Sequence, residues 1–181
     1  MRSLLFYVGL SLFLIGCKND LDDARKITSR SNVNIERGKD IEIIYSSMGE
    51  NKIKAFAPTL LRFNTEKPYV EFVDGVKINF YDKDGNVETS MTAKHATVQD
   101  GSSLMIARND VVVTNLKGEK LNTEELVWDE SRKQIYSNSF VKITTEDEIL
   151  MGQGMESNET FTDYTIKKIT GVIKVKSTEM P

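Results

Sequence analysis

Two residues that could do chemistry each occur only once in the chain, His95 and Cys17. A histidine transfers protons near neutral pH or binds a metal, but it needs further ligands or a nucleophile beside it. The sequence offers no second histidine and no phosphate-binding or nucleophile-elbow glycine motif. The acidic pairs at 82/84 and 129/130 and the acidic triplet at 146–148 fall in expected turns, where solvation accounts for them. We therefore expect no enzyme, no metal and no cofactor, and leave His95 without an assigned role.

The position of Cys17 suggests a different chemistry. Residues 1–16 contain Arg2 and an apolar run, Leu4 to Ile15, which suits a signal peptide and is shorter than the ~20 residues of a spanning helix. The segment from Leu14 to Cys17 is similar to the lipobox of bacterial lipoproteins. That similarity implies cleavage before Cys17 and acylation of the new N-terminus, which holds a protein to a membrane by about 0.8 kcal/mol per buried CH₂.

The rest of the chain predicts a tether, one domain and a short tail. Residues 17–40 are polar and aperiodic and suit a flexible lipidated tether, and residues 177–181 form the tail. Residues 41–176 alternate apolar with polar positions and are rich in β-branched and aromatic residues, which is typical of strands. Turn pairs at 84–85, 100–101 and 117–118 predict tight hairpins. The net charge of −3, without a basic stripe, argues against a nucleic-acid partner.

Within this domain apolar residues recur at intervals of about thirty residues, which predicts stacked hairpin units. The aligned sets are Met91/Leu121/Met151, Val111/Val141/Gly171, Val113/Ile143/Ile173 and Ile106/Tyr136/Ile166, with a looser copy ending in Val76, Ile78 and Phe80. The alternation changes parity between Leu121 and Leu126, so a bulge near Glu124-Glu125 is needed to return both to one face. Curved, bulged, antiparallel strands predict an all-β fold, a twisted open β-jelly roll built of repeated hairpin units.

One apolar face of this sheet is the candidate binding surface. Its predicted inward residues are Val76, Ile78, Phe80, Met91, Val111, Val113, Leu121, Leu126, Trp128, Val141, Ile143, Met151 and Ile173. Methionines in such a row adapt to irregular apolar partners. By themselves the residues favour a closed core, in which these side chains pack on one another, over an open groove.

The order and spacing of the segments resemble the LptC family of lipopolysaccharide export proteins and, more broadly, the LptA/OstA-like β-jelly rolls. The similar stretches are Pro68–Phe72, Gly75–Asp82, Met91–Val98, Asn109–Thr114, Gly118–Asp129, Val141–Ile143 and Gly152–Met155. The resemblance extends from about Ile41 to Val175. The best-known members cross the inner membrane with one helix, whereas this chain has a lipobox, so the resemblance bears on the fold more than on the anchor.

The resemblance implies a lipopolysaccharide transport bridge without catalysis. It implies an apolar groove that accepts lipopolysaccharide from an inner-membrane ABC transporter and passes it to an LptA-like periplasmic protein. Partners would add strands at the edges, with candidates Ile41, Ile43 and Tyr45 at one edge and Ile166 and Ile169 at the other. It also implies a periplasm-facing protein at the inner rather than the outer membrane, and the lipobox adds that this protein would be a lipoprotein. A structural β-lipoprotein with a closed core and an outer-membrane paralogue that binds another lipid or a glycan are the alternatives.

Overall fold

The computed structural model describes residues 34–47 and 49–174, and the statements below concern this part of the chain. The predicted signal peptide, Cys17 and the predicted tail lie outside the described residues. The described secondary structure is entirely β. Accordingly, the part of the chain described contains no helix long and apolar enough to cross a membrane.

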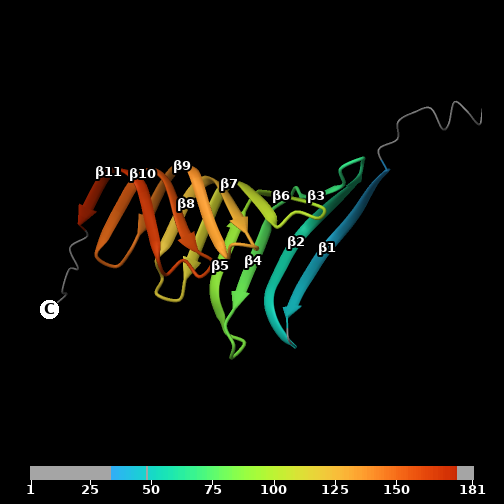
Figure 1. Ribbon diagram of the computed structural model, residues 1–181, viewed down its shortest axis with the longest axis horizontal. Coiled ribbons are helices and arrows are strands. Elements are labelled where there is room, and N and C mark those ends of the chain that lie inside the picture. The colour runs from blue at the N-terminus through green and yellow to red at the C-terminus, as the bar shows by residue number, and fades with distance from the viewer. Residues whose placement is uncertain (1–33, 48, 175–181) are drawn as a thin grey trace, which may run out of the picture. The chain divides into compact units, whose positions relative to one another are not determined.

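Antiparallel pairing joins the strands into one 11-stranded sheet, which confirms the predicted all-β, twisted jelly-roll fold. The strands are β1 (Asn34–Ser47), β2 (Glu50–Asn64), β3 (Tyr69–Phe72), β4 (Val76–Tyr81), β5 (Val87–Ala93), β6 (His95–Gln99), β7 (Leu104–Asn115), β8 (Lys120–Asp129), β9 (Gln134–Thr144), β10 (Glu148–Asn158) and β11 (Tyr164–Lys174). Figure 1 shows the sheet extending from β1 at one end to β11 at the other. Among the described strands, β1 pairs only with β2 and β11 only with β10.

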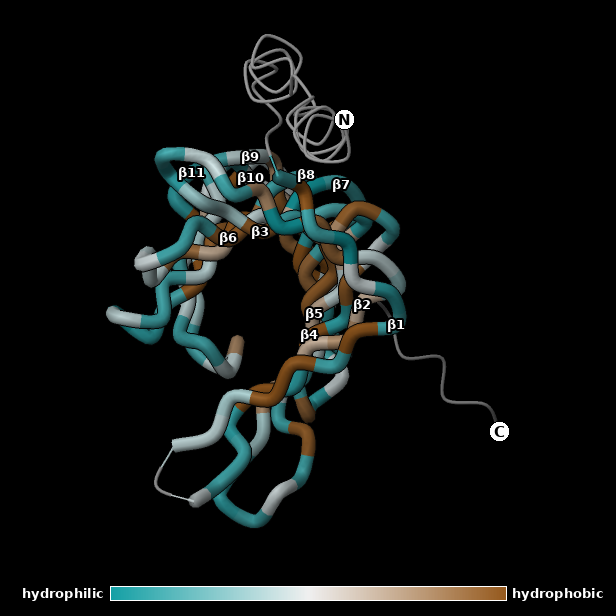
Figure 2. Tube along the Cα trace, turned by 90° about the vertical axis from the view of Figure 1, so that its right-hand side faces the viewer, coloured by the Kyte–Doolittle hydropathy of each residue, from teal (hydrophilic) through white to brown (hydrophobic). Residues whose placement is uncertain are grey.

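Two long strands divide the sheet into two walls. One part of β2 pairs with β4 and the other with β3, while β7 likewise pairs with β5 and with β6. The short strands are therefore halves of bent strands, β3 with β4 and β5 with β6. We call β4, β5 and the halves of the longer strands that continue the same side of the bend the first wall. The second wall consists of β3, β6 and the other halves of the longer strands. Figure 2 shows the trace curving around the interior between them, with apolar segments in β2, β4 and β5.

Bulges produce the bend between the walls. The pairing register shifts between Arg108 and Val111 in β7 and between Thr123 and Val127 in β8, which confirms the bulge predicted near Glu124-Glu125. In β10 the shift coincides with Gly154, whose φ of 75° lies in the left-handed region that glycine adopts without strain. An extra residue on one strand bends it and increases its twist. Because the bulges occur in successive strands, the whole sheet folds along one line.

Pro58 occurs in β2 at this same bend. It falls between the residues that pair with β4 and those that pair with β3, and β1 skips it as well. A proline has no N–H to donate, so it is tolerated in a strand only where no ladder hydrogen bond is needed. This explains how β2 continues through a proline to Asn64.

Two local predictions are corrected. Residues 34–40, counted with the tether, belong to β1, because residues 34–39 pair with β2 residues 59–64 and mostly polar residues form a strand where a neighbouring strand supplies the hydrogen bonds. In the sequence, Ser137-Asn138 separates the apolar segments 134–136 and 140–144 and therefore predicts a turn, but in the structure β9 continues through both residues with a change of direction. There the Ser137 hydroxyl donates to the Glu125 carbonyl at 2.6 Å and accepts the Ser139 N–H at 3.1 Å, so the chain changes direction without ending the strand.

Candidate functional site

An apolar row crosses the first wall on its inner face. From β1 to β11 its members are Ile43, Ala55, Ile78, Met91, Val113, Leu121, Ile143, Leu150 and Val172, each paired directly with the next. Residues directly opposite each other on antiparallel strands point to the same face of a sheet. The row, called the inner row below, is therefore continuous from one edge strand to the other.

Burial along the inner row changes with position. Leu121 and Ile143 in the middle are 0% exposed, and Val113 is 2% exposed. At the two ends, Ile43 is 41% and Val172 is 52% exposed. The middle of the interior is therefore a packed core, whereas both ends present the same apolar surface to their surroundings.

The second wall supplies the facing apolar surface. Its main row consists of Leu60, Phe72, Ala96, Ala107 and Leu126, again paired one with the next. The two alanines are 0% exposed. The walls come into direct contact where the rings of Phe80 and Trp128 meet edge to face, with centroids 5.5 Å apart at 84°. Such an aromatic pair contributes about 1 kcal/mol beyond its buried area.

A cavity of ≈ 550 Å³ lies at the mouth between the walls, next to this aromatic contact. Phe80 and Ile53 from the first wall and Trp128 from the second supply its apolar lining. Lys52 and Lys133 are among its charged residues, and each pairs with a glutamate, Glu50 and Glu159 respectively. The mouth thus combines an apolar floor with a polar rim that carries charges of both signs, Lys52 and Lys133 against Glu88, Glu130 and Glu159.

The loop between β10 and β11, residues 159–163, crosses the mouth, and we call it the closing loop. Thr89 on β5 donates its hydroxyl to the Thr160 carbonyl at 2.9 Å, and Asn115 donates to the Phe161 carbonyl at 2.8 Å. From the second wall, the Trp128 indole N–H donates to the Glu159 carboxylate at 2.9 Å. Phe161 is 0% exposed and stacks on Tyr164, with ring centroids 5.1 Å apart. The loop therefore joins both walls and places an aromatic ring inside the interior.

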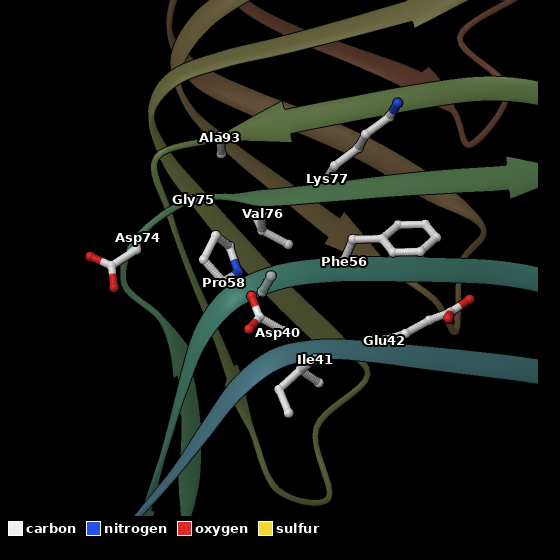
Figure 3. A pocket seen from close by; sticks show the side chains of 11 residues that line it. Asp40, Ile41, Glu42, Phe56, Pro58, Asp74, Gly75, Val76, Lys77 and Ala93 are labelled. Carbon is white, nitrogen blue, oxygen red and sulfur yellow. The ribbon is translucent and has the colours of Figure 1, made fainter.

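A second depression lies at the bend of β1, β2 and β4, with a volume of ≈ 590 Å³ (Figure 3). It is shallow and open, and its lining includes Ile41, Phe56, Pro58 and Val76. Phe56 pairs with Lys77 of β4 and stands on the same face as it, opposite to the inner row. This depression adds exposed apolar surface near the β1 edge.

Most of the predicted inward residues lie in the interior. Val76, Ile78, Phe80, Met91, Val111, Val113, Leu121, Leu126, Val141 and Ile143 are buried in the core, and Trp128 packs against it. Met151 and Ile173 do not join them, because they pair with Lys142 and Ile149, on the face opposite to Ile143 and Leu150. In the last copy, Leu150 is equivalent to Leu121 and Val172 to Ile143, so the interval is 29 residues instead of thirty. A shift of one residue places a side chain on the opposite face of the sheet.

The predicted edge residues occupy the two end strands, Ile41, Ile43 and Tyr45 in β1 and Ile166 and Ile169 in β11. Ile166 packs against the core, whereas Ile169 is 58% exposed. Phe161 was not predicted, because it stands in a polar segment, Asn158 to Asp163, without strand periodicity. Its isolated aromatic side chain between polar residues was the only signal available.

Several polar side chains among the described residues form ion pairs or cap turns. The Nε2 atom of His95 lies 3.9 Å from the Oε2 atom of Glu71. No group of three or more metal-ligating side chains occurs among the described residues. Asp129 is buried at the end of β8, where the Ser131 hydroxyl donates to it at 2.6 Å. This hydrogen bond is the largest of the contributions that hold the pKa of Asp129 below its ordinary value. The carboxylate thereby caps the turn that leads into β9.

Fold and interior together define an open β-jelly roll whose two apolar walls face each other. The family model described as "LptC: Lipopolysaccharide-assembly, LptC-related" matches residues 4–173, and the chain belongs to this family. No curated protein sequence matches the chain significantly. Membership implies a role in lipopolysaccharide transport, with lipopolysaccharide binding and association with the Lpt transport system. The family comprises non-enzymatic, periplasm-facing components tied to the inner membrane.

Proposed function

We propose that this chain is a lipid-anchored segment of the transport bridge that shelters the acyl chains of lipopolysaccharide between its two walls. The observation that carries the proposal is the inner row, which is packed in the middle and exposed at both ends, Ile43 and Val172. A closed structural domain has no need for one apolar row that reaches both of its edges. A carrier does, because its cargo must enter at one end and leave at the other.

The hydrophobic effect supplies the reason for such a row. Each methylene group of an acyl chain costs about 0.8 kcal/mol when it is moved from an apolar environment into water. A lipid with several acyl chains therefore cannot cross an aqueous compartment uncovered at a useful rate. An apolar surface that continues from one protein to the next removes this cost without covalent chemistry.

The edge strands give the proposal a direction. β1 would pair with a strand of the inner-membrane transporter, and β11 with an LptA-like periplasmic protein, since an edge strand offers free backbone N–H and C=O groups for strand addition. Acylation of Cys17, outside the described residues, would hold the N-terminal edge close to the inner membrane. Lipopolysaccharide would then pass from β1 towards β11.

The test uses two matched pairs of positions for a photoreactive benzophenone amino acid in cells. Ile43 and Ile44 are neighbours in β1 that are 41% and 50% exposed, but only Ile43 belongs to the inner row. Val172 and Ile173 form the same kind of pair in β11, at 52% and 51%. Because exposure is similar within each pair, a difference in crosslinking reports the face rather than accessibility.

We expect lipopolysaccharide adducts at Ile43 and Val172 and few or none at Ile44 and Ile173. Equal yields within each pair would show unspecific surface contact and contradict the proposal. A folded, membrane-attached protein without adducts at any of the four positions would favour a structural β-lipoprotein, the alternative that the packed middle of the interior supports. Membrane fractionation separates both from an outer-membrane paralogue that binds another lipid or a glycan.

A further inference from the structure

Phe161 combines two properties that are seldom found together. It belongs to a loop, yet its side chain is 0% exposed and is part of the main apolar core. Its backbone has a φ of 52°, in the left-handed region that residues with a β-carbon avoid. The closing loop therefore adopts an unfavourable backbone conformation that directs one ring into the interior.

Few polar contacts hold the closing loop in place across the mouth. On the first wall these are the hydrogen bonds from Thr89 and Asn115 to two loop carbonyls. On the second wall Glu159 accepts from Trp128 and lies 3.8 Å from the ammonium group of Lys133, whose side chain is 80% exposed. An ion pair as exposed as this one contributes little to stability. The loop can thus leave its place without breaking a strand pairing.

The packed middle of the inner row presents a difficulty for the proposed function. Cargo that enters at Ile43 and leaves at Val172 must pass Leu121 and Ile143, which are 0% exposed. Some of the interior must therefore be vacated when an acyl chain is present. Among the buried apolar residues of the described core, Phe161 is the one that lies in a loop, and all the others lie in strands.

We propose that the closing loop is a displaceable plug, and that the Phe161 ring occupies the place of an acyl chain in the empty protein. The inference rests on the proposed function and deepens it. Loading of lipid moves the loop outward, exchanges the ring for the chain and lets the walls separate at the Phe80–Trp128 contact. When the lipid leaves, the ring returns and covers the apolar surface that would otherwise face water.

The first test weakens the plug without changing the core. Glu159→Ala removes the acceptor of the Trp128 indole and the partner of Lys133. Its matched control is Glu156→Ala, which removes an ion pair with Lys167 on the same hairpin but away from the mouth. With the photoreactive group at Ile43, we expect Glu159→Ala to raise the yield of lipopolysaccharide adduct about threefold, because a larger fraction of molecules has the loop displaced. Glu156→Ala should leave the yield unchanged.

The second test follows hydrogen exchange in the unmodified full chain. The protein is reconstituted in phospholipid vesicles with or without deep-rough lipopolysaccharide. Amide protection in residues 159–163 should fall about tenfold or more when lipopolysaccharide is present, while protection around Leu121 in β8 stays the same. Phe161→Ala is less informative, since the cavity that it creates weakens the fold directly.

The outcomes separate the plug from transport itself. Adducts at Ile43 together with unchanged loop protection, or with no effect of Glu159→Ala, would overturn the plug and leave the transport function standing. Absence of adducts at Ile43 and Val172 in every variant would overturn both. Two results together would establish the plug. Amide protection in the closing loop must fall only when lipopolysaccharide is present, and crosslinking at Ile43 must increase in Glu159→Ala but not in Glu156→Ala.

Discussion

The division of the inner row into a packed middle and exposed ends predicts very different effects for the same substitution. Ile143→Ala removes a side chain that is 0% exposed and is paired with Leu121 and Leu150. A large-to-small change at such a site costs the transfer free energy plus the cavity left behind, about 3 to 4 kcal/mol. Ile43→Ala removes the same atoms from a side chain that is 41% exposed. Without a closed cavity, its cost is about 1 kcal/mol.

Urea denaturation followed by tryptophan fluorescence measures both losses of stability. Trp128 is the only tryptophan in the chain and packs on the core, so its emission reports unfolding. With a denaturant slope of about 2 kcal/mol per molar urea, Ile143→Ala should lower the midpoint by about 1.5 to 2 M and Ile43→Ala by about 0.5 M. If both variants lose about 1 kcal/mol, the middle of the interior is an open groove and the packed-core argument is wrong. If both lose 3 kcal/mol or more, the ends are as closed as the middle.

Three further predictions address the hairpin, acid stability and the anchor. Gly152→Ala should cost about 2 kcal/mol and increase hydrogen exchange in β11, because a β-carbon there would lie 2.5 Å from the Lys168 carbonyl oxygen; unchanged β11 protection would contradict this. The pKa values of Asp129 and Asp82 are lowered by hydrogen bonds in the folded protein, so their stabilisation is present above about pH 4, the unfolded value, and is lost as the pH falls through the folded pKa. Melting temperatures measured from pH 6 to pH 2 should therefore fall less steeply in Asp129→Asn, and parallel curves would disprove the role of this carboxylate. Cys17→Ala should release the protein from membranes, and a variant that stays bound at high salt would contradict acylation there.

The local sequence was sufficient for the features that depend on near neighbours. Hairpin turns at Gly85, Gly101 and Gly118 have φ of 82°, 74° and 77°, as the expected turns require. The bulge near Glu124-Glu125 was predictable because the alternation of apolar residues changes parity inside β8. In each case the chemistry that determines the structure is contained in a few consecutive residues.

Features that depend on the partner strand were not accessible in this way. Met151 and Ile173 were assigned to the wrong face because the interval between equivalent residues shortens by one in the last copy, and periodicity cannot locate such a slip. The mostly polar residues 34–40 became part of β1 because β2 pairs with residues 34–39. Phe161 was missed because its burial comes from contacts with distant strands, through Thr89 and Asn115.

The two exposed ends of the inner row lie on the two strands that have a free backbone edge among the described residues. A partner strand added to β1 would place its own inward side chains directly beside Ile43, and one added to β11 would place them beside Val172. Strand pairing would therefore bury the exposed part of the row and extend the apolar surface in a single event. Separate sites for docking and for lipid would leave apolar surface uncovered at every junction. Because the exposed ends of the inner row lie on the strands with free edges, pairing with a partner also makes the lipid path continuous. A variant that prevents pairing at β11 should therefore also stop lipid from leaving past Val172.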